Sequence, residues 1–515
     1  MVASRHGADR LPGRRPRRPG AVPLPPVPAQ PPPSRADLSA AQQRLITELL
    51  RVAPVAEELG RRFADAGHDL ALVGGSVRDA LLGRLGHDLD FATDARPEQV
   101  VALLRGWADT WWEVGIAFGT VGARKGDVVI EVTTYRSETY RSESRKPEVA
   151  YGDSLEGDLV RRDFTVNAMA VLVQSSGPTT FVDPHDGLGD LARRLLRTPG
   201  RPEDSFADDP LRMVRAARFS AQLDFEVDQD VVDAMTAMAE RITIVSAERV
   251  RDELVKLICA DHPRRGLRLL VQTGLARYVL PELPALELEI DEHHRHKDVY
   301  EHTLTVLEQA MELEDPGAGP DFVLRMAALM HDVGKPKTRR FEPGGGVSFH
   351  HHEVVGAKLT AARMKALRFP KDLTADVARL VELHLRFHGY GTGAWTDSAV
   401  RRYVADAGPL LDRLHKLTRS DSTTRNRRKA LRLAAAYDDL EERIARLREQ
   451  EQLDAVRPDL DGNAIMAILG VPPGPVVGRA WGHLREVRLD QGPLSPQQAQ
   501  AELRRWWAEQ PESRG

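Results

Sequence analysis

The sequence of 515 residues has almost no cysteine and no long apolar run, and each scarcity excludes a class of protein. Cys259 is the only cysteine, so the chain can form neither an intramolecular disulfide nor a cysteine-rich zinc module, and a reducing compartment suits it. No apolar run approaches the roughly 18 residues that a membrane-spanning helix needs. These two absences predict a soluble, cytoplasmic protein that has no membrane partner.

An excess of charge of one sign is also lacking, because 72 lysine and arginine residues oppose 76 acidic residues and leave a net charge of −4. That balance alone argues against a nucleic-acid partner, although the distribution of charge matters more than its sum. The first 35 residues hold seven arginines, one aspartate, no lysine and ten prolines. Because so much proline breaks both a signal-peptide core and an amphipathic transit helix, we expect a disordered Arg/Pro-rich arm over residues 1–37.

The rest of the chain changes character along its length, and at roughly 150 residues per domain it should hold several domains. Strand-like runs alternate with helical segments up to about residue 190, which predicts a small mixed sheet. Helical periodicity then dominates, and ten of the seventeen histidines lie between His293 and His388. The predicted fold class is α+β, a mixed-sheet head followed by all-α parts. We expect a head at 38–190, a helical neck at 191–288, a candidate metal domain at 289–428 and a helical C-terminal tail at 429–515.

A glycine turn and a pair of aspartates mark the first candidate site. Gly74 and Gly75 lie between a predicted strand and a helix with Ser76 as its expected N-cap, and backbone amides at such a turn can hold phosphate oxygens. Asp88 and Asp90 are two residues apart in a predicted strand, so both side chains project from one face. Because adjacent carboxylates repel each other, bridging divalent cations such as Mg²⁺ explain the pair best.

Glu131 offers a third carboxylate to this site. It alternates with Val128, Ile130 and Val132 in a predicted strand and therefore points away from their apolar face. Two metals held by three carboxylates can activate an attacking hydroxyl and stabilise a departing pyrophosphate. An isolated pair of alternating aspartates is more often an exposed strand edge, but its combination with GGSVRD is much more specific.

Five motifs in order carry a resemblance to a known family. They are LVGGSVRDALLGRLGHDLDFAT, RRDFTVNAMA, DPHDGLGDLARRLLRTP, DDPLRMVRAARF and SAERVRDEL, and together they extend over about residues 70–280. This series resembles the bacterial (class II) CCA-adding tRNA nucleotidyltransferases and the related bacterial poly(A) polymerases. The resemblance implies a nucleotidyltransferase head, a helical neck, body and tail, and the addition of C, C and A to tRNA 3′ ends from CTP and ATP.

The resemblance also implies roles for individual residues of the head. It assigns Asp88 and Asp90 to the catalytic metals, whereas Glu131 is a candidate from the alternation of its strand alone. It places Gly75 and Arg78, beside Gly74, at the nucleotide phosphates. Contacts to the ribose and the triphosphate are implied for Arg161, Arg162, Asp163 and Asn167.

Asp209 and Arg212 in the fourth motif are candidates for reading the nucleotide base. Three residues apart on a predicted helix, they would present an acceptor and a donor on one face. Cytosine and adenine both show an amino donor beside a ring-nitrogen acceptor, whereas guanine and uracil show the reverse order. Arg215 and Arg218 continue this face and could meet phosphate or the primer terminus. The alternative is a helix with Asp209 as N-cap, Pro210 as its first residue and a solvated arginine face.

The histidine-rich region holds an ordered series of nitrogen and oxygen ligands. The series comprises His302, His331, Asp332, His352, His384, His388 and Asp421. Mixed histidine and carboxylate donors without sulfur suit Mn, Fe, Co, Ni or Mg ions that activate water. The series resembles the HD phosphohydrolase domain, and this resemblance implies a second metal held by His302, His331, Asp332 and Asp421. HD domains include both active hydrolases and inert appendages, so the ligand set leaves the activity open.

From the sequence alone, several activities stay open. CCA addition to tRNA with a fused hydrolase domain leads, and its neighbours are poly(A) polymerase and enzymes that add only CC or only A. A guanosine alarmone synthetase/hydrolase ranks low, because its HD part comes first and the RRDFT and DDPLR motifs are absent from it. A catalytically silent RNA-binding protein also ranks low, since Asp88, Asp90 and Arg212 are all present. No protein partner is implied.

Overall fold

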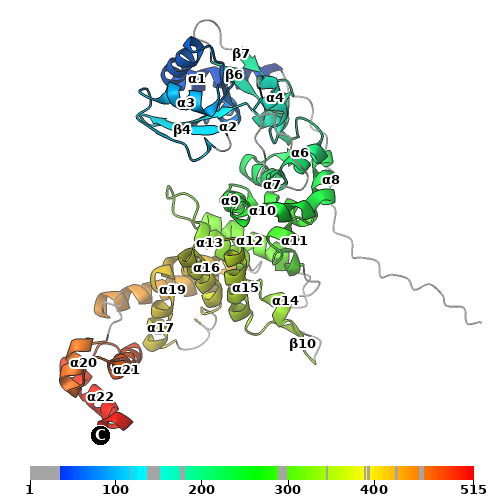
Figure 1. The fold of residues 1–515 in the computed structure, drawn as a ribbon. Helices are drawn as coiled ribbons and strands as arrows, with labels where there is room; N and C mark the ends of the chain where they lie inside the picture. The colour runs from blue at the N-terminus through cyan, green and yellow to red at the C-terminus, as the bar shows by residue number, and fades with distance from the viewer. Residues whose placement is uncertain are drawn as a thin grey trace, which may run out of the picture.

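The computed structural model describes residues 35–116, 119–135, 151–152, 154–173, 180–287, 299–343, 346–387, 390, 395–423, 427–451 and 458–514. The arm predicted over residues 1–37 lies almost wholly outside these ranges, and so does His388. Figure 1 shows the sheet-containing head at one end of the chain and the C-terminal helices at the other, with helices between them. None of the described helices combines the length and the apolar composition that crossing a membrane would take.

The head contains a seven-stranded mixed sheet, as the alternation in the sequence predicted. Across the sheet the strands are β3 (Thr110–Trp112), β4 (Thr120–Lys125), β5 (Val128–Thr134), β2 (Asp88–Thr93), β1 (Leu70–Val73), β6 (Ala170–Leu172) and β7 (Thr180–Val182). The pair β2 and β5 is parallel, and the other pairs are antiparallel. The strands β3 and β7 were not expected from the sequence, because three residues are too few to show an alternating pattern.

Helices bury both faces of this sheet. Along β1, Leu70 and Leu72 join the large core on one face, whereas Ala71 and Val73 join a smaller core on the other. The larger core also receives side chains from three helices, α1 (Arg35–Asp65), α2 (Gly75–Leu81) and α3 (Pro97–Leu104). The smaller core is closed by α4 (Leu155–Val160). A strand that is covered on both faces is apolar throughout, which explains the continuous run LALV.

The neck consists mainly of helices, as the helical periodicity after about residue 190 predicted. Its helices are α5 (Gly187–Arg193), α6 (Pro202–Asp208), α7 (Leu211–Leu223), α8 (Gln229–Met238), α9 (Ala247–Ile258), α10 (Pro263–Gln272) and α11 (Ala276–Val279). Two short strands, β8 (Leu195–Leu196) and β9 (Glu226–Val227), pair in parallel within it. Local signals define several ends, for example Ser246, whose side chain caps α9.

The histidine-rich domain and the tail complete the chain. The former contains α12 (Val299–Glu312), α13 (Phe322–Met330), α14 (Lys335–Thr338), α15 (His352–Ala366), α16 (Lys371–Leu383), α17 (Asp397–Ala407) and α18 (Leu411–Asp421), with a hairpin of β10 (Arg340–Phe341) and β11 (Val347–Ser348). The tail contains α19 (Arg427–Glu451), α20 (Gly462–Leu469), α21 (Pro475–Gln491) and α22 (Pro496–Ala508).

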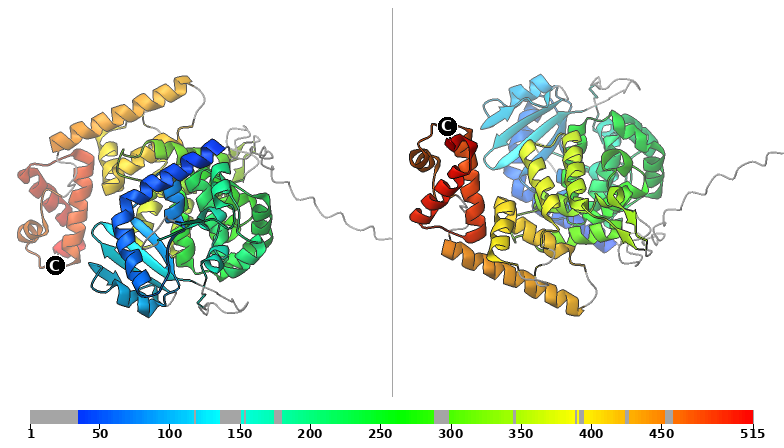
Figure 2. Two further views of the ribbon diagram at one scale, coloured as in Figure 1. Left: turned by 90° about the horizontal axis from the view of Figure 1, so that it is seen from above. Right: turned by 90° about the horizontal axis from the view of Figure 1, so that it is seen from below.

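The described hydrophobic cores divide the chain near its C-terminal end. One buried cluster is continuous from the head through the neck to α19, whereas α20, α21 and α22 enclose a cluster of their own. Both views in Figure 2 show these last helices beside α19 and away from the neck. Because α19 begins at Arg427, its start lies beside the boundary predicted at 428–429. The domain boundaries themselves stay predictions.

Candidate active site and metal centre

Three carboxylates stand on one face of the parallel strands β2 and β5. Asp90 pairs in register with Glu131, and Asp88 lies two residues earlier on β2, opposite Val129. The three carboxylate side chains are exposed, whereas Leu89 between the two aspartates is buried. The structure therefore brings together the three carboxylates on which the sequence analysis placed a metal site.

Crowding raises the pKa of Asp90 to about 6. The largest cause is that the surrounding protein removes part of the water around this carboxylate, although some of the side chain stays exposed. The second cause is repulsion between the charges of Glu131 and Asp90. Arg162 and Arg78 offset part of both effects. A divalent cation would relieve the remaining repulsion, and a donor set of carboxylate oxygens suits Mg²⁺. The residues present therefore fit a divalent cation.

Gly74 and Gly75 form the turn beside these carboxylates. Gly74 is the N-cap of α2 and has a φ of 67°, a left-handed conformation that glycine adopts without steric cost. A Cβ at this position would lie 2.7 Å from Nη1 of Arg162 and 4.0 Å from Oδ2 of Asp90. The turn, the arginine and the aspartate are thus in close proximity, and a side chain at Gly74 would displace the guanidinium of Arg162.

The expectation that Ser76 caps α2 is wrong. The helix begins at Gly75 after the cap at Gly74, which leaves Ser76 buried inside the first turn. Its hydroxyl accepts a hydrogen bond from the backbone amide of Asp90 at 2.9 Å. This hydrogen bond connects α2 to β2, because its donor belongs to the neighbouring strand and not to the helix of Ser76.

A polar network connects the head to the neck. Arg78 donates to Oδ1 of Asn167 at 2.6 Å, and Asn167 donates to Oδ1 of Asp163 at 2.9 Å. Oδ2 of Asp163 accepts two hydrogen bonds from Arg215 of α7. Burial raises the pKa of Asp163, but Arg215 and Asn167 outweigh this effect and hold the pKa far below its usual range. Three of the predicted phosphate and ribose residues, Arg78, Asn167 and Asp163, thus form one connected set.

Glu253 of α9 completes this network, and the only sign of it in the sequence was its place in the fifth motif. Its carboxylate is buried, with Oε2 2.9 Å from Nε of Arg218 and Oε1 3.4 Å from Nη1 of Arg215. Burial and repulsion from Arg215 lower the pKa of Arg218 to about 10. Both arginines, which we expected to meet phosphate or the primer terminus, are directed inward to buried carboxylates.

Asp209 and Arg212 meet at the start of α7 but do not share a helix face. Asp209 has an extended backbone, with a φ of −142°, because a residue before proline disfavours the helical conformation. Its Oδ1 accepts a hydrogen bond from the amide of Leu211 at 3.1 Å, as a capping residue does. Its Oδ2 accepts from Nη2 of Arg249 at 2.7 Å. Arg212 lies within the helix.

The paired arginines of the second motif have different surroundings. Nη2 of Arg161 lies 3.7 Å from the carboxylate of Asp208, and the carbonyl of Arg161 accepts a hydrogen bond from Arg212 at 2.6 Å. Arg162 instead donates to Oδ2 of Asp158 at 2.9 Å, with its Nη1 against the Gly74 turn. Arg162 is therefore beside the carboxylate site, whereas Arg161 is beside the base-reading candidates.

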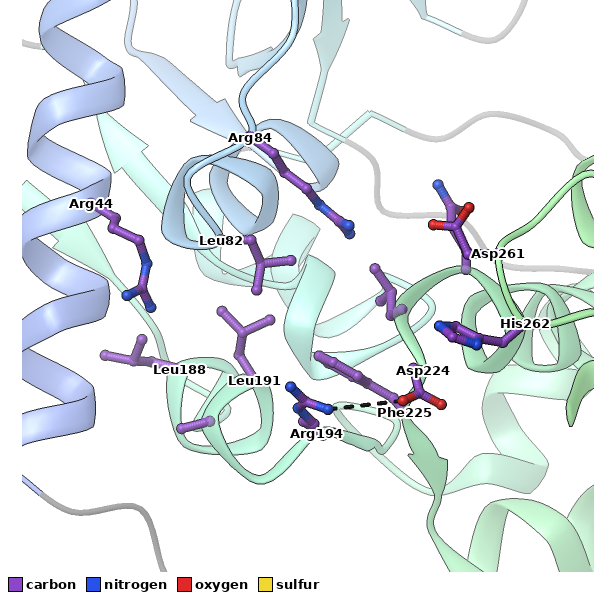
Figure 3. Close-up of a pocket in the computed structure, with 13 residues that line it drawn as sticks. Arg44, Leu82, Arg84, Leu188, Leu191, Arg194, Asp224, Phe225, Asp261 and His262 are labelled. Carbon is purple, nitrogen blue, oxygen red and sulfur yellow. Dashed lines mark ion pairs between the residues drawn. The ribbon is translucent and has the colours of Figure 1, made fainter. Parts of the chain in front are cut away.

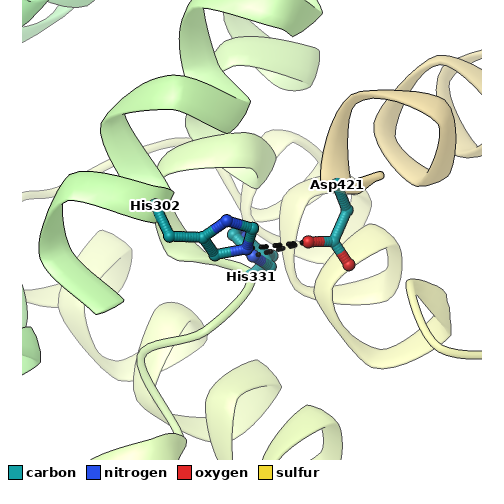
Figure 4. Close-up of side chains that lie close together, drawn as sticks. All are labelled: His302, His331 and Asp421. Carbon is teal, nitrogen blue, oxygen red and sulfur yellow. Dashed lines mark hydrogen bonds and ion pairs between the residues drawn. The ribbon is translucent and has the colours of Figure 1, made fainter. Parts of the chain in front are cut away.

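Six side chains converge at a second centre in the histidine-rich domain. Figure 4 shows His302, His331 and Asp421, whose ligand atoms lie within 4.8 Å of one another. A second group with the same spacing contains Asp332, His352 and His384. Asp332 connects the groups, since Oδ2 is 3.2 Å from Nε2 of His331 and Oδ1 is 3.3 Å from Nε2 of His352.

Three of these histidines are oriented for metal binding by backbone carbonyls. Nδ1 of His331, His352 and His384 donates to the carbonyl three residues earlier, at 2.8, 2.8 and 2.6 Å respectively. This hydrogen bond leaves the lone pair on Nε2 free to bind a metal when the ring is neutral. All three Nε2 atoms are buried without a hydrogen-bond partner among the described residues. The centre therefore fits a cation that nitrogen and oxygen donors hold.

The charges of this centre are strongly perturbed. Burial lowers the pKa of His331, but Asp332 and Asp421 outweigh burial and raise it to about 10. Burial and the neighbouring charge of His331 lower the pKa of His384 to about 3. A proton on His331 and the ammonium of Lys335, 2.9 Å from Asp332, thus balance the two carboxylates, and a bound cation would take the place of the proton.

His352 and His384 belong to the ligand series expected from the sequence but not to its expected metal set, and Gly334 was not expected to matter. A Cβ on Gly334 would lie 2.0 Å from the carbonyl oxygen of His352. Glycine therefore lets the turn that follows Asp332 approach the start of α15. The motif HDVGKP was the available signal, because it contains this glycine.

A cavity of about 590 Å³ lies between the head and the neck. Figure 3 shows Arg44, Arg84 and Arg194 directed toward it, with Leu188 and Leu191 among its apolar wall. None of the predicted site residues lines this cavity, so it is separate from both centres.

Comparisons with known proteins agree with the order of these sites. The Poly A polymerase head domain matches residues 70–197, the probable RNA and SrmB binding site of polymerase A matches 224–286, and the HD domain matches 299–447. The CCA-adding enzyme of Bacillus stearothermophilus, solved in complex with CTP, shares the fold with a TM-score of 0.61 at 24% identity. That alignment covers 88% of this chain and 96% of the other.

Curated relatives extend the likeness to the sequence. The CCA-adding enzyme of Levilactobacillus brevis is 42% identical over 214 residues, which are 41% of this chain and 52% of that enzyme, so the match spans about half of each. The A-adding tRNA nucleotidyltransferase of Deinococcus radiodurans is 36% identical over 459 residues, which are 86% of this chain and 96% of that enzyme. With a relative of this identity along almost the whole of its length, the chain belongs to the family of bacterial tRNA nucleotidyltransferases and poly(A) polymerases.

Proposed function

We propose that this protein adds C, C and A to the 3′ end of tRNA from CTP and ATP, with Mg²⁺ held by Asp88 and Asp90. The observation that carries this proposal is the arrangement of these aspartates and Glu131 on one strand pair, beside the Gly74 turn. Relatives named as CCA-adding and A-adding enzymes support it.

The proposed reaction is a nucleotidyl transfer. The 3′-hydroxyl oxygen of the tRNA forms a bond to the α-phosphorus of the nucleotide, the bond to the β-phosphate oxygen breaks, and pyrophosphate leaves. Cations held by the three carboxylates would neutralise the charge that develops on these phosphates. Arg162 and the turn at Gly74 border Asp90 and would contact the triphosphate there. Arg78 and Asn167, through Asp163, connect this site to the neck.

Base selection would reside in Asp209 and Arg212 at the start of α7. The carboxylate would accept from the amino group of cytosine or adenine, and the guanidinium would donate to the adjacent ring nitrogen. Arg212 contacts the carbonyl of Arg161, in the motif that also contains Arg162 beside the carboxylates. The residues that read the base would thus lie next to the residues that bind the phosphates.

A second candidate function is the addition of the terminal A alone. The relative that matches along nearly the whole chain, from Deinococcus radiodurans, is named as an A-adding enzyme. Incubation with each labelled nucleotide separately distinguishes the two, using one tRNA that lacks all three terminal nucleotides and another that ends in CC. We expect C on the first tRNA and A on the second. An enzyme that ignores CTP on both would be A-adding, and long A tracts would indicate a poly(A) polymerase.

For the histidine-rich domain, we propose a second divalent metal centre that hydrolyses a phosphoester at an RNA 3′ end. The support is the orphaned Nε2 atoms of His331, His352 and His384 around Asp332. Mn, Co, Ni or Mg ions suit such donors and would supply a metal-activated water. A 3′-phosphate or a 2′,3′-cyclic phosphate blocks nucleotide addition, and its removal would restore the free 3′-hydroxyl that the head requires. Hydrolysis assays on these two substrates, with metal analysis, test the proposal.

A further inference from the structure

Ser205 lies outside the five motifs, yet it contacts the base-reading arginine directly. Its hydroxyl accepts a hydrogen bond from Nη1 of Arg212 at 2.9 Å, and its carbonyl lies 3.4 Å from the same nitrogen. At the other terminal nitrogen, Nη2 donates to the carbonyl of Arg161 at 2.6 Å. The guanidinium of Arg212 is therefore held at both of its terminal nitrogens.

These contacts join three separate elements around one side chain. Ser205 belongs to α6, Arg212 belongs to α7, and Arg161 is the C-cap of α4 in the head. Since the guanidinium is planar and its donors have a fixed geometry, two anchors determine the direction of its remaining N–H groups. Without these two anchors, the side chain of Arg212 would populate several rotamers and its N–H donors would point in several directions.

Asp209 has an equivalent partner in Arg249. Oδ2 of Asp209 accepts from Nη2 of Arg249 at 2.7 Å, while Oδ1 is held by the amide of Leu211. Arg249 belongs to α9, and about half of its side chain is exposed. Both oxygens of the carboxylate are therefore fixed, as the guanidinium is.

We propose that Ser205 and Arg249 are positioning residues for nucleotide selection, with Ser205 orienting Arg212 and Arg249 orienting Asp209. This inference rests on the proposed reading of the base by Asp209 and Arg212. Neither positioning residue needs to touch the nucleotide. Each restricts a base-reading group to one direction, so that cytosine and adenine meet a matched donor and acceptor, whereas uracil and guanine meet like groups.

The hydroxyl of Ser205 can be removed with little effect on packing. The side chain is half-buried, and the apolar anchor of α6 in the core is its neighbour Phe206, which is fully buried. Ser205→Ala therefore removes one acceptor from Arg212, while Ser205→Thr retains a hydroxyl at the same position. Arg249→Gln and Arg249→Lys form the matched pair for Asp209.

The test measures kcat and KM for CTP, ATP, UTP and GTP on the appropriate tRNA acceptors, together with tRNA affinity and the thermal midpoint. We expect Ser205→Ala to reduce the preference for CTP over UTP, and for ATP over GTP, by about tenfold and mainly through KM, as the loss of one hydrogen bond to a charged group would. Ser205→Thr should restore the preference. Arg249→Gln should reduce it, and Arg249→Lys should retain part of it.

Two controls separate this inference from the proposed function. Thr236→Ala removes an exposed hydroxyl from α8 of the same neck and should leave the preference unchanged. Arg212→Ala should abolish the preference. If Arg212→Ala does so but Ser205→Ala does not, the positioning role is refuted and base reading stands. If Arg212→Ala also leaves selection intact, base reading itself is refuted. If Ser205→Ala reduced kcat equally for all four nucleotides and lowered the thermal midpoint, Ser205 would have only a structural role.

Discussion

Oδ2 of Asp163 accepts hydrogen bonds from Nε and Nη2 of Arg215, at 2.8 and 2.5 Å, across the junction of the head and the neck. The carboxylate is buried and the two residues are 52 positions apart in the chain. We expect Asp163→Asn to lower the free energy of unfolding by about 3 kcal/mol, because it removes the charge of a buried carboxylate and leaves the half-buried guanidinium of Arg215 with only the more distant Glu253. Denaturant unfolding measures this change.

An exposed ion pair in the same neck is the control for this prediction. Arg201 and Glu203 lie 3.6 Å apart, and half or more of each side chain is exposed. Glu203→Gln should change the free energy of unfolding by no more than about 0.5 kcal/mol. Equal changes for Asp163→Asn and Glu203→Gln would contradict a special role for the junction.

The raised pKa of Asp90 predicts how metal binding in the head depends on pH. A cation requires the deprotonated carboxylate, so affinity should fall as the pH drops through about 6, the pKa of Asp90. At pH 5 we expect roughly tenfold weaker binding than at pH 7. Calorimetric titration with Mn²⁺ as the probe measures it, in a His331→Ala background that removes the second centre. Constant affinity between pH 5 and 7 would contradict metal binding by an Asp90 of raised pKa.

Local patterns in the sequence revealed the fold and the carboxylate site. Alternation placed Glu131 opposite the apolar face of its strand, and the structure pairs it in register with Asp90. The helical periodicity expected after about residue 190 corresponds to the neck helices, of which α7 (Leu211–Leu223) is one. These features depend on neighbours a few residues away, which the sequence displays directly.

The partners of several side chains could not be predicted from the sequence, because they belong to distant segments of the chain. Arg215 and Arg218 were expected to meet phosphate or the primer terminus, because their partner Glu253 follows 38 residues after Arg215, on another helix. In the same way, Ser76 bonds a neighbouring strand 14 residues away instead of its own helix. A periodic pattern in the sequence cannot reveal such pairs of contacting residues, because they depend on how the helices and strands pack together.

For the second centre, we expect His331→Ala to abolish bound transition metal and any phosphoesterase activity. Its Nε2 lies 3.2 Å from Oδ2 of Asp332 and 3.5 Å from Oδ1 of Asp421, so the variant removes a metal ligand from between the two carboxylates. Incorporation into unblocked tRNA should persist, because the head retains its own carboxylates. His350→Ala, at an exposed position, is the control. Metal analysis of the purified proteins decides whether the centre exists, and metal without turnover would leave a structural site.

Gly334 should be as important to this centre as its ligands. Gly334→Ala would place a Cβ 2.0 Å from the carbonyl oxygen of His352 and force α15 away from Asp332. We expect loss of metal and a destabilisation of about 1–3 kcal/mol, as overpacking produces. Gly482→Ala in α21 meets no atom within 4 Å and should be neutral. Normal metal content in Gly334→Ala would contradict the close approach as a requirement for the centre.

Sequencing the 3′ ends of tRNA that initially lacks its last three nucleotides, after incubation with all four nucleotides and Mg²⁺, tests the central claim most directly. The account predicts that the wild type adds C, C and A and then stops. Asp88→Asn, which removes a ligand charge but retains the shape, should reduce addition by at least about 100-fold. Asp127→Asn, an exposed position in the turn between β4 and β5, should match the wild type. Addition by Asp88→Asn at the wild-type rate, or ends other than CCA from the wild type, would contradict the account.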